Sequence, residues 1–210
     1  HRIRKVTPQG VVSTVAGSYG YADGTGTAAL FNAPYGIALN PSGDLIVADR
    51  TNQRVRKVTT AGVVTTLAGN GFARLADGSA ASAVFATPRG ACFDPAGNLY
   101  VADTDNHVIR KVAADGTVST FAGTGMPGFK DGAKAVAMFS GPYGVFWEAS
   151  GSLLVADYNN HRIRRVSADG TVSTVAGTGS AAHADGPAAQ AKFYHPRAVV
   201  ADGTGTIYVA

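Results

Sequence analysis

The sequence predicts an all-β protein, and three observations carry that prediction. Val and Thr, which favour strands, are abundant, and the 27 Gly residues mark frequent turns. Glu occurs once, at Glu148, so a residue typical of helices is almost absent. A strand-rich unit, seen most clearly at 98–123, recurs along the chain.

The repeat has a period of 54 residues. The Phe of a Phe-x-x-Pro motif marks it at Phe31, Phe85, Phe139 and Phe193. The Asp of an Asp-Gly pair keeps the same register at Asp23, Asp77, Asp131 and Asp185. Series that run in one register indicate one structural unit used four times.

Each unit contains four strand signals in a fixed order. The first strand follows the Pro, at 36–40 and its copies, and the second is Leu45–Ala48 and its copies. The third carries the basic pattern of Ile109–Val112, and the fourth ends at Ala-Gly. The turns between them are short, so each unit should be an antiparallel four-stranded meander. In the long loop that follows, Asp-Gly before an Ala-rich segment predicts a short helix capped by the Asp.

Repeated four-stranded meanders predict the blades of a β-propeller. A single blade cannot bury both of its faces, but blades packed around an axis can. We expect one domain, 1–210, with continuous blades at about 35–69, 89–123 and 143–177. The chain begins with strands three and four, in 1–17, and ends with strands one and two, in 198–210. We therefore expect a fourth blade shared by the termini, which would close the ring and leave no free strand edge.

The units resemble the NHL repeat. The resemblance rests on Pro-x-Gly-hydrophobic-Ala, on Gly-Asn-Leu-Tyr-Val-Ala-Asp at 97–103 and on Asn-His-x-Ile-Arg at 106–110, with copies over 34–58 and 142–166. It implies a β-propeller, usually of six blades in this family. Four blades here imply a small ring, part of a larger ring, or an arc completed by a second chain. The resemblance also implies protein or RNA binding, which is typical of the family. A minority of its members are enzymes, among them a zinc-dependent amidating lyase.

The residue after each repeated Pro is the candidate for ligand binding, because this position alternates between two residue types. The set is Tyr35, Arg89, Tyr143 and Arg197, which should ring one mouth of the central channel with His195 beside them. Two guanidinium groups across two phenols would suit a carboxylate, a phosphate or an acidic side chain of a partner. The alternative is that Tyr and Arg only pack over a narrow mouth.

The basic third strands suggest either a nucleic-acid surface or structural ion pairs. The net charge of +4 favours RNA, but a repeat spreads its charges around the ring, whereas phosphate binding needs them on one face. We expect the basic side chains to pair with residues such as Asp103 and Asp157 or to stay solvated. The repeated His1, His107 and His161 are expected to be structural for the same reason.

No catalytic residue, metal or cofactor is predicted. His195 is a lone histidine, whereas a zinc site needs three or four protein ligands, so the zinc lyase chemistry does not carry over. We expect Cys92 to be a buried, inert thiol and Trp147 to fill space in the core rather than to support a ligand.

These observations together predict a non-enzymatic binding or scaffold module. Its partner would be an unknown protein, a peptide or a small anionic ligand; an RNA-binding propeller, a lyase or hydrolase with its site at the channel mouth, and a purely structural fragment are the alternatives. No apolar run reaches the ~20 residues of a membrane helix, so no membrane contact is expected. A monomer is preferred over a dimer that exchanges its ends. A secreted or periplasmic location is compatible with the sequence, which shows no signal peptide but is already in mid-pattern at residue 1.

Overall fold

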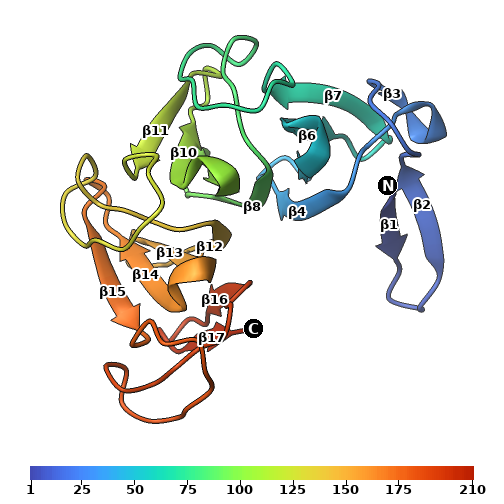
Figure 1. Cartoon of the computed structure of the whole chain (residues 1–210). Coiled ribbons are helices and arrows are strands. Elements are labelled where there is room, and N and C mark those ends of the chain that lie inside the picture. Colours follow the sequence, from blue (N-terminus) through green and yellow to red (C-terminus); the bar gives the residue numbers. More distant parts are fainter.

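In the computed structural model, which describes residues 1–210, five antiparallel sheets follow one another along an open arc (Figure 1). The first complete blade contains β4 (Pro34–Leu39), β5 (Leu45–Asp49), β6 (Arg54–Val58) and β7 (Val63–Ala68), with the short β3 (Gly24–Thr25) beside β7. The second contains β8 (Pro88–Phe93), β9 (Leu99–Asp103), β10 (Val108–Val112) and β11 (Val118–Ala122). The third contains β12 (Pro142–Trp147), β13 (Leu153–Asp157), β14 (Arg162–Val166) and β15 (Val172–Ala176). The predicted all-β class and its antiparallel meanders are confirmed.

The two ends of the chain form separate two-stranded sheets. One contains β1 (Ile3–Val6) and β2 (Val12–Ala16), and the other β16 (Val199–Ala201) and β17 (Ile207–Val209). They lie at opposite ends of the arc, and no strand pairing joins them (Figure 1). The structure therefore differs from the predicted closure by the chain's own ends. Ring closure depends on how far each blade is rotated against the next, and the successive blades follow an open arc that leaves β1–β2 and β16–β17 apart.

The core lies in layers between successive blades. Alternate residues of the strands face these layers, as the period of two in a strand requires. Phe31, Phe85 and Phe139, from the repeated Phe-x-x-Pro motif, are fully buried in them. Trp147 packs against the same core and its ring stacks on Tyr100 with centroids 4.8 Å apart, as expected for a space-filling residue.

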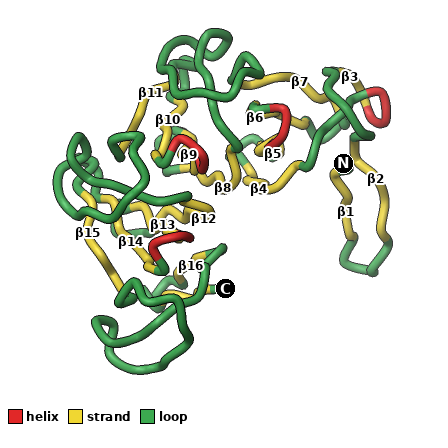
Figure 2. Tube along the Cα trace, in the orientation of Figure 1, coloured by secondary structure: helices red, strands yellow, loops and turns green.

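The helices are single 3₁₀ turns (Figure 2). Three of them fill the Asp-x-x-Asn turns: η2 (Arg50–Asn52), η3 (Thr104–Asn106) and η4 (Tyr158–Asn160). In the long loops, only η1 (Gly26–Ala28) forms, and no side chain caps it. The predicted Asp-capped helices are therefore wrong. Asp23, Asp77 and Asp131 bind an arginine instead, and the segment after Asp185 forms only turns. No helix of the structure has the length and apolar character needed to cross a membrane.

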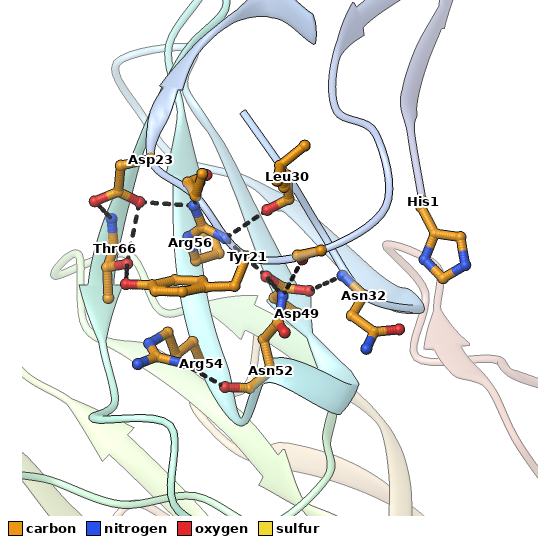
Figure 3. Close-up of polar contacts among 12 residues, drawn as sticks. His1, Tyr21, Asp23, Leu30, Asn32, Asp49, Asn52, Arg54, Arg56 and Thr66 are labelled. Atoms are coloured by element: carbon orange, nitrogen blue, oxygen red, sulfur yellow. Dashed lines mark hydrogen bonds and ion pairs between the residues drawn. The ribbon is translucent and has the colours of Figure 1, made fainter. Parts of the chain in front are cut away.

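A buried arginine holds each complete blade to the loop before it. Arg56 of β6 donates to Asp49, at 2.8 Å, and to Asp23, at 2.6 Å, and its side chain is fully buried (Figure 3). It also donates to the carbonyls of Leu30 and Ala22. The equivalent pairs are Arg110 with Asp103 and Asp77, and Arg164 with Asp157 and Asp131. The predicted structural role of these basic residues is confirmed, and their burial removes them from any nucleic-acid surface.

The repeated histidines are also structural. Nδ1 of His1, His107 and His161 accepts the backbone N–H of Ala33, Gly141 and His195, at 2.9, 3.0 and 3.1 Å. Gln53 occupies the same repeat position and accepts the N–H of Thr87 through Oε1. Each of these residues thus fixes the turn that precedes the first strand of the next blade.

Candidate functional site

The candidate site lies where the first strands of the blades begin. Strands β4, β8 and β12 run side by side along the inside of the arc (Figure 1), and a Gly is the third residue of each. A Cβ at Gly36 or Gly90 would collide with the carbonyl of Arg89 or Tyr143 on the next strand. The missing side chains therefore allow a close approach of the backbones, and that approach brings together the residues just before each Gly.

Tyr35, Arg89 and Tyr143 meet at this place. The rings of Tyr35 and Tyr143 contact edge to face with centroids 5.9 Å apart. The guanidinium carbon of Arg89 lies 4.0 Å from the Tyr143 centroid and 5.3 Å from that of Tyr35. Cation–π contact with two rings fixes the position of Arg89 without neutralising its charge. Burial raises the pKa of the Tyr143 phenol, the charge of Arg89 opposing this, so the phenol stays protonated.

Arg197 and His195 join this group through a residue that the sequence analysis did not identify, Tyr158. Its ring stacks on Tyr143 on one side and on His195 on the other, each at 4.2 Å between centroids. The guanidinium carbon of Arg197 lies 5.6 Å from the Tyr158 centroid, and the Tyr158 hydroxyl raises the pKa of that arginine. The five predicted residues and Tyr158 thus form one continuous cluster, here called the mouth cluster.

Tyr158 was missed because it lies in the Asp-x-x-Asn turn, which was assigned to the scaffold. The sequence does show that this position varies from unit to unit, since the residues equivalent to Tyr158 are Arg50 and Thr104. A position that varies among three otherwise similar units is freed from the demands of the fold. Thr104 illustrates the structural alternative, because its hydroxyl donates to the carbonyl of Pro142 at 2.7 Å.

The two arginines of the mouth cluster have no acidic partner. Neither Arg89 nor Arg197 forms an ion pair, although the chain contains several Arg–Asp pairs elsewhere. Nε of Arg89 is buried and has no hydrogen-bond partner. The cluster therefore carries two uncompensated positive charges, and these attract an anion.

His195 has an unusual backbone conformation. Its φ of 53° lies in the left-handed region, as do those of Ala33, Thr87 and Gly141 at the same repeat position. Because Ala and Gly occupy this position in other units, the turn itself does not require an imidazole here. Nδ1 of His195 is buried without a hydrogen-bond partner, while the ring stacks on Tyr158.

The remaining candidates take structural roles. Glu148 is buried and receives two hydrogen bonds from Arg165, at 2.7 and 2.8 Å. Burial raises the pKa of the Cys92 thiol to about 12, so it is a poor nucleophile. Burial also raises the pKa of Asp103 to about 6, against the hydrogen bonds that it accepts from Asn106 and Arg110. No group of three or more His, Cys, Asp or Glu residues is arranged to hold a metal ion.

Comparisons with known proteins agree with this architecture. The model of the NHL repeat matches residues 31–58 and 85–112. The chain is 40% identical over 91 residues to Protein SUPPRESSOR OF QUENCHING 1 of Arabidopsis thaliana, covering 43% of this chain and 9% of that protein. It is 39% identical over 82 residues to human NHL repeat-containing protein 2, covering 39% of this chain and 11% of the relative.

Solved structures share the fold. An auxiliary nutrient binding protein of Bacteroides thetaiotaomicron superposes with a TM-score of 0.74 and 19% identity over 98% of this chain and 49% of that one. A virginiamycin B lyase of Staphylococcus aureus superposes with a TM-score of 0.60 and 12% identity, over 100% of this chain and 56% of the lyase. The chain thus spans about a tenth of the two relatives by sequence and about half of these two structures.

The match to the repeat model and the relatives that carry the same repeat agree with the motifs at 97–103 and 106–110. The chain carries NHL repeats at residues 31–58 and 85–112.

Proposed function

We propose that this chain is a non-enzymatic binding module that holds an anionic group at the mouth cluster. The anion is a carboxylate or a phosphate, carried by a small ligand, by a peptide or by an acidic side chain of a protein partner. The aromatic rings of Tyr35, Tyr143 and Tyr158 hold the arginines in place and offer apolar contact to the rest of the ligand.

The single observation that carries the proposal is the lack of any acidic partner for Arg89 and Arg197. Arg56, Arg110 and Arg164 each bind two aspartates, so the chain does not lack carboxylates for its arginines. Guanidinium groups without counter-charges bind carboxylates and phosphates through paired N–H donors. A ligand would supply the missing charge.

The proposal includes a blade count of four for this chain. Three blades are complete, and β16–β17 and β1–β2 correspond to the first and second halves of a further blade. What supports this is the order of the strands, since β16–β17 repeat the positions of β12–β13 and β1–β2 repeat those of β14–β15. The auxiliary nutrient binding protein supports a ligand-binding use of a similar fold, and with it a secreted or periplasmic location.

The test measures binding of a short anionic peptide. The probe is a rhodamine-labelled hexaglutamate peptide, followed by fluorescence anisotropy at low salt, with unlabelled hexaglutamate and inorganic phosphate as competitors. The test variants are Arg89→Tyr and Arg197→Tyr, because Tyr occupies the equivalent position in two other units and the fold accommodates it there. We expect each variant to weaken binding about tenfold or more, as loss of a charge-assisted hydrogen bond does.

The matched control is Arg74→Tyr, which removes the same charge from an exposed loop residue that is not part of the cluster. Binding that Arg74→Tyr weakens as much as the test variants would reflect the net charge of the chain and would contradict the proposal. Displacement by RNA but not by hexaglutamate or phosphate would favour the RNA-binding alternative over this one.

A further inference from the structure

The first and second complete blades enclose a cleft at a place that is filled between the second and third blades. We propose that this cleft binds a small aromatic carboxylate, a free molecule in which a planar ring carries a carboxylate group. The site is separate from the mouth cluster, because Asn40 and Phe93 lie at the ends of β4 and β8, whereas Tyr35 lies at the beginning of β4. All residues that line the cleft belong to two complete blades that are neighbours in the arc (Figure 1).

The cleft has a volume of about 400 Å³ and a mostly apolar wall. Ile46, Leu99 and Val112 line it and are each at most 3% exposed. Leu67 and Phe93 are half-buried and complete the apolar wall. An apolar cavity of roughly 150 Å³ holds a benzene ring, and sites for small ligands measure about 300–1,000 Å³. The cleft therefore has room for an aromatic ring together with a polar substituent.

The equivalent place between the second and third blades is filled by aromatic side chains. The Tyr100 ring stacks on Trp147 and contacts Phe121 edge to face, each with centroids 4.8 Å apart. The residues at the same repeat positions around the cleft are smaller in every case: Ile46, Phe93 and Leu67. Strand pairing has the same register in the two blades that carry Ile46 and Tyr100, so the smaller side chains leave space at the place that rings fill elsewhere.

The same comparison indicates which groups a bound ring would meet. In the second blade the Tyr100 hydroxyl donates to Asp94, and Nζ of Lys111 lies 6.0 Å from the centroid of the Tyr100 ring. In the first blade, Asn40 and Lys57 hold the positions of Asp94 and Lys111, and both line the cleft. A ring bound in the place of Tyr100 would therefore lie beside an ammonium group, which attracts the face of an aromatic ring, and beside an amide.

The polar side chains of the cleft favour an anion. In the third blade, Arg165 holds the position of Lys57 and donates to Glu148 at 2.7 and 2.8 Å. Asn40 holds the position of Glu148 in the first blade, so Lys57 forms no ion pair, and no acidic residue lines the cleft. Oδ1 of Asn40 accepts the N–H of Asp44 at 2.7 Å, which leaves Nδ2 to donate into the cleft. Both side chains thus offer donors, and a carboxylate on the ring would supply the acceptor.

The first measurement is the binding of cinnamate to the 210-residue chain by isothermal titration calorimetry at low salt. We expect saturable binding at a single site. Crotonate has the same unsaturated carboxylate without the ring, and cinnamyl alcohol has the ring without the charge. Each should bind at least about tenfold more weakly than cinnamate. Lack of saturable cinnamate binding would overturn the proposal, as would equal binding of the three compounds.

Removal of the positive charge tests the role of Lys57. In Lys57→Met the ammonium group is lost and most of the apolar stem is kept, and we expect cinnamate to bind at least about tenfold more weakly. The matched control is Lys111→Met, at the same repeat position but beside the place that Tyr100 fills. This control should bind cinnamate as the unchanged chain does. Equal weakening by the two substitutions would show attraction to the net charge of the chain and would contradict the proposal.

Filling the cleft tests its location. Ile46→Tyr introduces the ring that Tyr100 provides in the next blade, and it should abolish cinnamate binding while hexaglutamate binding at the mouth cluster is retained. Leu67→Phe fills the same cleft from a half-buried position and serves as a second variant if the buried substitution unfolds the chain. Cinnamate binding that is unchanged in the folded variants would place the site elsewhere and refute the proposal. Displacement of cinnamate by hexaglutamate would also refute it, because the two probes would then share the mouth cluster.

Discussion

Arginine is used in two opposite ways in this chain. In the third strands, Arg56, Arg110 and Arg164 are fully buried, and each donates to two aspartates and two carbonyls. At the openings of the first strands, Arg89 and Arg197 contact aromatic rings and no carboxylate. Both sets come from repeated positions, but only the first set has its partners repeated with it.

This difference separates the scaffold from the site. A charge buried with all its partners is part of the fold, because removing one partner leaves the other charge unpaired. A charge held by aromatic rings keeps its positive charge available for a ligand. Repetition of a residue together with its partners therefore indicates structure, and repetition without partners indicates a position free to bind something else.

Removing one arginine of each kind tests whether the two kinds contribute differently to stability. Arg110→Ala leaves Asp103 buried without its cation, and we expect the free energy of unfolding to fall by about 3–5 kcal/mol. Arg89→Tyr leaves no buried charge behind, and we expect a change within about 0.5 kcal/mol. Urea unfolding followed by circular dichroism measures both. Equal losses for the two variants would mean that Arg89 is also part of the scaffold.

A second test concerns how the mouth cluster is positioned. In Gly90→Ala the new Cβ meets the backbone carbonyl of Tyr143, which cannot move without displacing β12. We expect a loss of about 1–3 kcal/mol, as for other overpacked sites, together with weaker hexaglutamate binding. Gly203→Ala is the matched control, because nothing lies within 4 Å of its Cβ position. If Gly90→Ala binds hexaglutamate as well as the unchanged chain, the spacing of β8 and β12 does not set the site.

The sequence predicted the blades well because each blade depends on local patterns: alternating strands, short turns and a motif that returns after 54 residues. The prediction from the sequence was wrong for features that depend on how the blades pack on one another. The closure between 198–210 and 1–17 was expected from the order of the strands, but it depends on how successive blades pack on one another, and it is not present in the structure.

The candidate site shows the same limit. The positions of Tyr35, Arg89, Tyr143 and Arg197 followed from their alternation after the repeated Pro. The contribution of Tyr158 did not, because a turn residue reaches the cluster only once the third blade is packed against its neighbours. The predicted loop helices failed for a similar reason, since Arg56 from another strand binds the carboxylate of Asp23 that would have capped one of them.

A smaller effect is expected from pH, through the histidines that fix the turns. Burial lowers the pKa of His107 against the opposing charge of Asp105, and burial together with His195 and Arg162 lowers that of His161. The unfolded chain then binds more protons than the folded chain as the pH falls below about 6.5. The contribution of His107 and His161 to stability should be fully present above about pH 6.5. It should decrease as the pH falls toward the pKa values of these histidines in the folded chain, and level off below them.

His107→Gln isolates this effect, because Gln53 fulfils the same role without a titrating group. We expect the variant to match the unchanged chain at pH 8 and to lose less stability at pH 5, as measured by thermal unfolding at both values. A parallel decrease in both proteins would assign the pH dependence to other groups.

The smallest effect on stability, and the one that tests the edge of the mouth cluster, is expected for His195→Gly. Gly relieves the left-handed backbone at φ 53°, which favours folding by about 1–2 kcal/mol, while loss of the stack on Tyr158 costs about 0.5–1.5 kcal/mol. The two effects oppose each other, so unfolding should change by no more than about 1 kcal/mol. Binding of the hexaglutamate probe should nevertheless weaken, because Tyr158 loses the ring that holds it against Arg197. Unchanged binding in both His195→Gly and His195→Ala would exclude His195 from the site and confine the cluster to the tyrosines and arginines.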